Sequence, residues 1–146
     1  GKLVALLRKK ARAIAEEKGY NLIIVDGSPG TGCPVIASVT GASYLLIVTE
    51  PTVSGLHDLK RALELAAHFR VKSGVCVNRA DINSEVASEI EAYCSSKGIS
   101  FLGTIPYDKD VTYAQIAGKS VIEHSKGPAS AAIKELWNRL SSEILV

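Results

Sequence analysis

The chain has 146 residues and a formal net charge of +2, with 47% hydrophobic and 22% charged residues. This ordinary globular composition excludes a disordered protein and predicts one domain with its own core over residues 1–146. The small net charge argues against binding to nucleic acid. No apolar run approaches membrane-spanning length and no signal peptide is visible, so we expect no membrane contact and a cytoplasmic protein.

Cysteine usage points to a reducing compartment. Cys33, Cys76 and Cys94 are odd in number and have no C-x-x-C spacing, which argues against a disulfide framework and a self-contained metal site. Cys33 lies at the start of a predicted helix, where the helix dipole favours a reactive thiolate, but a small packed residue in a loop is the simpler interpretation. Because the chain begins at Gly1 and contains no Met, we expect it to be part of a longer protein.

In chain order, residues 1–18 predict a helix with a solvated basic face. Apolar runs that do not alternate, typical of strands covered on both faces, occupy residues 22–25, 44–48, 75–77 and 100–105. Amphipathic helices are predicted at 53–69, 84–97 and 133–144. Gly19, Gly41 and Gly98 fall where left-handed helix caps are expected. This order predicts an α/β fold, a mainly parallel sheet flanked by helices.

Four polar loops follow the predicted strands. Ligands of open α/β sheets bind beyond the carboxyl ends of the strands, and the opposite ends of these strands are short and plain. We therefore expect one functional edge, formed by residues 26–30, 49–52, 78–81 and 106–108.

The first of these loops carries a candidate metal-side acid. Asp26 directly follows an apolar run, where it could hold Mg²⁺ through the water shell of the ion. Gly30 and Gly32 would let the backbone approach a terminal phosphate. The residues alone leave open the alternative that Asp26 caps the short helix predicted to begin near Pro34.

The later loops carry groups that suit a purine base. Asn78 can donate and accept at a purine edge, and Arg79 can cover a ring face. Pro106 has no amide hydrogen to interfere with a base. An ordinary Asx turn that leads into the next helix is the alternative for residues 78–81.

A phosphate-binding loop of the pattern G-x-x-x-x-G-K-[ST] is not found in the sequence. Gly118, Lys119 and Ser120 supply its last three residues, but Tyr113 stands where the first glycine is required. The preceding residues also favour a helix, whereas such a loop must follow a strand. The sequence of the polar edge therefore contains no phosphate cradle of its own.

Together these loops resemble the MinD/ParA-type P-loop ATPases, over about residues 1–123. The resemblance is carried by "IIVDGSPGTGCPVIASVTGASYLLIVTEPTVSGLHDLKRALEL", "VNRADIN" and "GTIPYDKDV". It is nearest to the MinD-superfamily ATPases that contain an inserted ferredoxin domain; the cobyrinic acid a,c-diamide synthase nucleotide-binding group and the Mrp-type iron–sulfur carriers are more distant. In that family the phosphate loop and the insert come first. The resemblance thus implies an incomplete P-loop NTPase (Rossmann-like) fold that lacks the P-loop strand.

The resemblance also assigns roles to residues. It makes Asp26 the magnesium-side acid and Gly30 the switch glycine near the γ-phosphate. Nucleotide-binding roles fall to the base-reading Asn78 and to three residues of the purine wall, Arg79, Pro106 and Asp108. Residues 50–52 and Asp58 would face a dimer partner.

By the same resemblance, the parent protein is an ATPase linked to iron–sulfur chemistry. The parent would use ATP and Mg²⁺ and carry 4Fe-4S clusters in an insert outside this chain. The 146-residue chain by itself would be inactive and would hold no cofactor tightly. Expected partners are ATP, the N-terminal P-loop and ferredoxin segment of the same protein, a second copy in a homodimer, and an unidentified iron–sulfur or redox protein.

The missing strand has a predicted consequence. It would lie between the strands at 22–26 and 44–49, so we expect these two to close the gap or the chain to dimerise there. Two other functional hypotheses remain: a non-catalytic binding or regulatory module, and the nucleotide-binding domain of a cobyrinic acid a,c-diamide synthase-like amidotransferase.

Overall fold

The computed structural model of the chain describes residues 2–28 and 32–145. In chain order its elements are α1 (Lys2–Lys18), α2 (Cys33–Val39), β1 (Tyr44–Thr49), α3 (Val53–His68), β2 (Lys72–Asn78), η1 (Ala80–Ile82), α4 (Ser84–Ser96), β3 (Ser100–Ile105), α5 (Lys109–Ile116), α6 (Val121–His124) and α7 (Pro128–Ile144). The three later predicted strands and all the predicted helices are confirmed, with small shifts of their ends. Gly19, Gly41 and Gly98 have φ of +68°, +73° and +64°, as predicted for left-handed caps.

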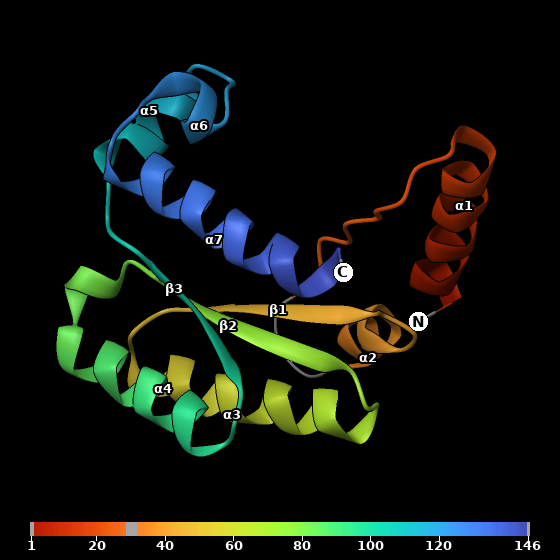
Figure 1. Cartoon of the computed structure of the whole chain (residues 1–146), viewed down its shortest axis with the longest axis horizontal. Coiled ribbons are helices and arrows are strands. Elements are labelled where there is room, and N and C mark those ends of the chain that lie inside the picture. Colours follow the sequence, from red (N-terminus) through yellow and green to blue (C-terminus); the bar gives the residue numbers. More distant parts are fainter. Residues whose placement is uncertain (1, 29–31, 146) are drawn as a thin grey trace.

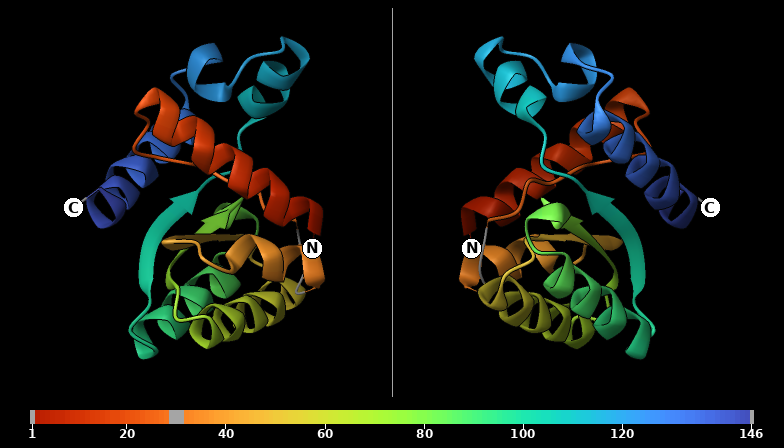
Figure 2. Two further views of the ribbon diagram at one scale, coloured as in Figure 1. Left: turned by 90° about the vertical axis from the view of Figure 1, so that its right-hand side faces the viewer. Right: turned by 90° about the vertical axis from the view of Figure 1, so that its left-hand side faces the viewer.

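A parallel sheet of order β1-β2-β3 forms the centre of the fold, as predicted. Tyr44 of β1 lies opposite Lys72 of β2, and Asn78 of β2 lies opposite Ile105 of β3. Figure 1 shows α3 and α4 against one face of the sheet and α7 across the other, and Figure 2 shows α5 and α6 at the far end from α3 and α4. All three strands therefore end at one edge, where the predicted functional loops begin.

The main core lies between the sheet and the helices α3 and α4. Leu59 of α3, Ile90 of α4 and Val75 of β2 have at most 1% of their surface exposed. The 3–4 spacing of apolar residues in each helix places them on the face that meets the sheet. The full cluster comprises Leu56, Leu59, Leu63, Val75, Val77, Ala87, Ile90 and Cys94.

On the other face, Glu143 fastens the end of α7 to the first residue of every strand. Its Oε2 accepts hydrogen bonds from Tyr44 Oη at 2.9 Å and from Ser100 Oγ at 3.1 Å, and lies 3.2 Å from Lys72 Nζ. Burial opposes ionisation of Glu143, but these bonds together hold its pKa below the usual range. Burial, together with the hydrogen bond and charge of Glu143, raises the pKa of Tyr44.

This carboxylate predicts a loss of stability in acid. Because the folded state lowers the pKa of Glu143 from 4.5, its stabilising contribution is present above pH 4.5 and is lost as the pH falls through the lowered folded value. We expect Glu143→Gln to reduce the fall in the free energy of unfolding below pH 4.5, measured by urea titrations between pH 3 and 6. Glu17→Gln, on an exposed position of α1, controls for the loss of a surface charge. An unchanged pH dependence in Glu143→Gln would contradict this role.

The prediction of a strand at residues 22–25 is wrong. The chain between α1 and α2 is neither helix nor strand over residues 20–28, and Figure 1 shows it outside the sheet. Ile24 is 77% exposed. An apolar run forms a strand only when its backbone groups find a neighbouring strand, and no described residue pairs with this run.

The predicted closure of the gap is therefore also wrong. Among the described residues β1 pairs with β2 alone, and residues 22–25 do not join its other side. Val48 of β1 is left 55% exposed. Dimerisation through this edge stays a prediction. Within residues 2–28 and 32–145, no helix is both long and apolar enough to cross a membrane.

Candidate functional site: the carboxyl edge of the sheet

The loop after β1 is held tightly by its own hydroxyl groups. Thr52 is the N-cap residue of α3, and its side chain accepts the N–H of Gly55 at 2.9 Å. Thr49 donates from Oγ1 to the carbonyl of Gly55 at 3.0 Å. Pro51 is buried. These contacts leave the carboxylate of Glu50 on the surface, facing the loop of the next strand.

The loop after β2 turns sharply at Arg79, whose φ of 52° and ψ of 42° are left-handed. Asn78 Oδ1 accepts the N–H of Arg79, the next residue, at 3.1 Å. This is not the Asx turn considered as the alternative, in which the side chain would bind the amide two residues on. The guanidinium of Arg79 lies 3.4 Å from Glu50 Oε1, with both side chains about half exposed (52% and 49%). In this structure Arg79 therefore pairs with the neighbouring loop, and its place in the purine wall stays a prediction.

The loop after β3 is joined to the loop before it. Asp81 Oδ1 accepts the N–H of Tyr107 at 2.7 Å. Pro106 directly follows Ile105, the β3 residue that lies opposite Asn78. The structure thus brings Asn78 and Pro106 to adjacent positions at the ends of neighbouring strands.

Asp108 is occupied by two helix termini. Its Oδ1 accepts the N–H of Asp110 at 2.9 Å, which caps the N-terminus of α5. Its Oδ2 accepts the N–H of Ala129 at 3.1 Å, in the first turn of α7. A carboxylate at two helix N-termini satisfies free amides and opposes the positive ends of both dipoles. The structure gives Asp108 a capping role, and its place in the purine wall stays a prediction.

Of the predicted metal-side acid and switch glycine, only Asp26 is described, and it does not lie in the sheet. Asp26 is exposed on the extended segment between α1 and α2, and Gly30 lies outside the described residues. In the described part of the chain, no group of three His, Cys, Asp or Glu side chains is found that could by itself hold a metal ion. The metal-side role of Asp26 and the switch role of Gly30 stay predictions.

The described cysteines are poor nucleophiles. Cys76 and Cys94 are free and buried. Burial raises the pKa of the Cys76 thiol to about 11, and burial likewise raises the pKa of Cys94. Both thiols are protonated near neutral pH and pack as small apolar groups. The side chain of Cys33 lies outside the described part, so its role stays open.

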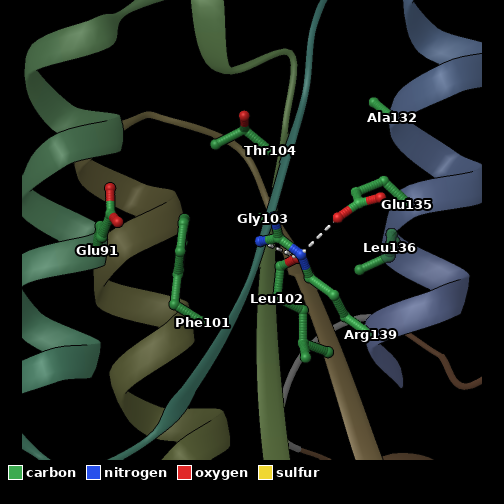
Figure 3. Close-up of a pocket in the computed structure, with 9 residues that line it drawn as sticks. All are labelled: Glu91, Phe101, Leu102, Gly103, Thr104, Ala132, Glu135, Leu136 and Arg139. Carbon is green, nitrogen blue, oxygen red and sulfur yellow. Dashed lines mark hydrogen bonds and ion pairs between the residues drawn. The ribbon is translucent and has the colours of Figure 1, made fainter. Parts of the chain in front are cut away.

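A groove of about 400 Å³ lies elsewhere, along β3 between α4 and α7 (Figure 3). Arg139 of α7 crosses it, donating from Nη1 to the carbonyl of Leu102 at 3.3 Å and from Nε to Glu135 at 3.1 Å. This guanidinium binds a backbone carbonyl of β3, an edge strand of the described sheet, and so makes that acceptor less available to another strand. The groove is formed by the side of the sheet and not by the polar loops.

The sequence did not single out two contacts at the carboxyl edge. Glu50 is paired with Arg79, and Asp81 with the backbone of Tyr107. Both contacts join residues of the four predicted loops. The only feature of the sequence that pointed to these residues was their position directly after a strand. The pairing itself depends on the order of the strands, which brings loops from distant parts of the sequence together.

Comparisons with known proteins support the resemblance to MinD/ParA-type ATPases that the sequence motifs indicated. A search of protein-family models found no match. An uncharacterised protein of Methanocaldococcus jannaschii is 30% identical over 99% of this chain and 47% of its own length. An iron–sulfur cluster carrier protein of Pyrococcus horikoshii is 26% identical (99% and 53%). An uncharacterised ATP-binding protein of M. jannaschii is 29% identical (91% and 51%). The chain thus spans about half the length of the curated relatives that it matches.

Solved structures share the fold. The MinD cell division protein of Aquifex aeolicus superposes with a TM-score of 0.77 at 26% identity, over 92% of this chain and 58% of that protein. The parallel sheet flanked by helices is that of the Rossmann-like nucleotide-binding proteins. These similarities in sequence and structure support the resemblance of the chain to the MinD/ParA-type superfamily.

Proposed function

We propose that this chain is the C-terminal part of a MinD-like ATPase whose activity is linked to iron–sulfur (ferredoxin) chemistry. In this proposal the chain supplies the base-binding side of the ATP site, and a loop outside the 146 residues binds the phosphates. Support comes from the ATP-binding and iron–sulfur carrier relatives and from the share of the MinD structure that the chain covers.

The observation that carries the proposal is the pairing of Asn78 with the end of β3. Asn78 lies opposite Ile105, so Pro106 lies at the next position along the same edge. Asn78 Oδ1 accepts from Arg79, which orients the amide and leaves its Nδ2 donors for an adenine nitrogen. A proline beside it offers a flat apolar surface with no competing N–H.

The phosphate side belongs to the whole protein in this proposal. The exposed apolar run at 22–25 and the free edge of β1 are suited to joining a further strand, which would carry Asp26 to the carboxyl edge. Asp26 and Gly30 would then serve as the magnesium-side acid and the switch glycine. Mg²⁺ accompanies ATP as a shield for its phosphate charges. The 4Fe-4S insert, the homodimer and the cytoplasmic location belong to the same proposal.

The first test is Mg²⁺-ATP binding by calorimetry, on the 146-residue chain and on the full-length protein. We expect tight binding only in the full-length protein, because the sequence of the chain contains no phosphate-binding loop of the G-x-x-x-x-G-K-[ST] pattern. Asn78→Ala in the full-length protein should then weaken ATP binding up to about tenfold, since the base hydrogen bond from Nδ2, worth about 0.5–1.5 kcal/mol, is lost.

Asn138→Ala, an identical change on an exposed position of α7, is the matched control and should leave ATP affinity unchanged. Absence of ATP binding by both proteins would favour the non-catalytic module instead. Binding that does not respond to Asn78→Ala would show that the base lies elsewhere.

A further inference from the structure

A side chain that no predicted role has used joins two loops of the carboxyl edge. Asp81 lies in η1, and its Oδ1 accepts the backbone N–H of Tyr107 at 2.7 Å, across 26 positions of the sequence. A carboxylate that accepts from an amide forms a stronger bond than a neutral acceptor does. The bond therefore restrains the loop after β2 against the loop after β3.

Local sequence explains why these two groups meet. Pro106 has no N–H, so Tyr107 carries the first backbone donor after β3 that a neighbouring loop can bind. Arg79 takes a left-handed conformation, and the short 3-10 turn of η1 follows it. This turn reverses the chain within three residues of Asn78 and carries the carboxylate of Asp81 back to the edge of the sheet.

The bond between Asp81 and Tyr107 joins the two loops that form the proposed base site, the loop of Asn78 and the loop of Pro106. Asn78 and Ile105 are partners in the sheet, which fixes the two loops where they begin but not beyond the strand ends. Asp108, on the outer side, is fixed to the helices α5 and α7. Between these anchors lie Pro106 and Tyr107, and Asp81 is the side chain that binds this stretch from the Asn78 side.

We propose that Asp81 is a positioning residue for the purine site, holding Pro106 at a fixed distance from Asn78. The inference rests on the proposed ATP-binding function and adds a residue that acts through the backbone of Tyr107, without contact to the nucleotide. Its loss widens the base site while leaving the phosphate contacts intact.

The test compares a ligand that has a base with one that has none. In the full-length protein, binding of Mg²⁺-ATP and of Mg²⁺-tripolyphosphate is measured by calorimetry for wild type, Asp81→Ala and Asp81→Asn. We expect Asp81→Ala to weaken ATP binding about fivefold, the cost of one hydrogen bond, and to leave tripolyphosphate binding unchanged. Asp81→Asn keeps an oxygen acceptor and should stay within about twofold of wild type. Glu89→Ala, on an exposed position of α4, is the control.

A second measurement is independent of any nucleotide. Hydrogen exchange of the Tyr107 amide, followed by NMR, should accelerate in Asp81→Ala and not in Glu89→Ala. Equal weakening of both ligands, or weakening of neither, overturns the positioning role. If wild type binds tripolyphosphate but not ATP, or binds neither, the proposed function fails. Faster exchange in Asp81→Ala would then show a loop restraint with no base to position, which overturns the role as well.

Discussion

Replacing Ile90 by alanine will lower the free energy of unfolding by about 2–5 kcal/mol. Ile90 of α4 is completely buried and belongs to the cluster between α3, α4 and the sheet. The change removes apolar area from the core and leaves a cavity that α3 and the sheet can only partly fill, because both are held by other buried contacts. Urea unfolding followed by circular dichroism measures the loss.

Ile116→Ala is the matched control for this core. Ile116 is also helical, in α5, but it is 79% exposed, so the same substitution should change stability by less than about 0.5 kcal/mol. Similar losses in the two variants would mean that the core does not lie between the sheet and α3 and α4.

Replacing Gly55 by alanine will destabilise the protein by about 1–3 kcal/mol. In a helix, glycine to alanine normally stabilises by about 1 kcal/mol, so the expected sign is reversed. A methyl group on Gly55 would overlap the carbonyl oxygen of Glu50 and lie 3.0 Å from both Thr49 Oγ1 and Thr52 Oγ1. Backbone cannot move aside as cheaply as a side chain end, so the whole loop after β1 must shift.

The control for Gly55 is Gly27→Ala, because a methyl group on Gly27 meets no atom within 4 Å. Gly27→Ala should be neutral or slightly stabilising, through the smaller entropy of the unfolded chain. Thermal unfolding of both variants is sufficient to compare them. A gain of stability in Gly55→Ala would rule out the close approach of α3 to the loop of Glu50.

Sequence patterns predicted those elements whose partners lie within the chain. The strands at 44–49, 72–78 and 100–105 neighbour one another, and α3 and α4 cover them, so hydrophobic periodicity was sufficient. The run at 22–25 has the same composition as those strands. It failed as a strand because its backbone groups have no neighbour to pair with among the described residues, a condition that composition does not report.

The candidate site was predicted in part for a similar reason. Asn78 and Pro106 were placed together because strand ends of a parallel sheet share one edge, which follows from topology. The bonds of Glu50, Asp81 and Asp108 were not predictable, since each partner lies on another loop or helix. Their residue type and their position after a strand indicated that these acids make polar contacts at the edge. Only the fold shows which amides and cations they contact.

The helix α7 is attached to the sheet and its loops at both of its ends. Its first turn binds Asp108 beside the predicted base loop, and Glu143 near its last turn binds the first residue of each strand. Seventeen helical residues span about 25 Å and resist compression along the axis. A displacement of Asp108 is therefore opposed by its bond to α7, and through this helix by the contacts of Glu143 at the opposite edge of the sheet. The stiffness of the base loop is in this way supplied partly by contacts a full helix length away from it.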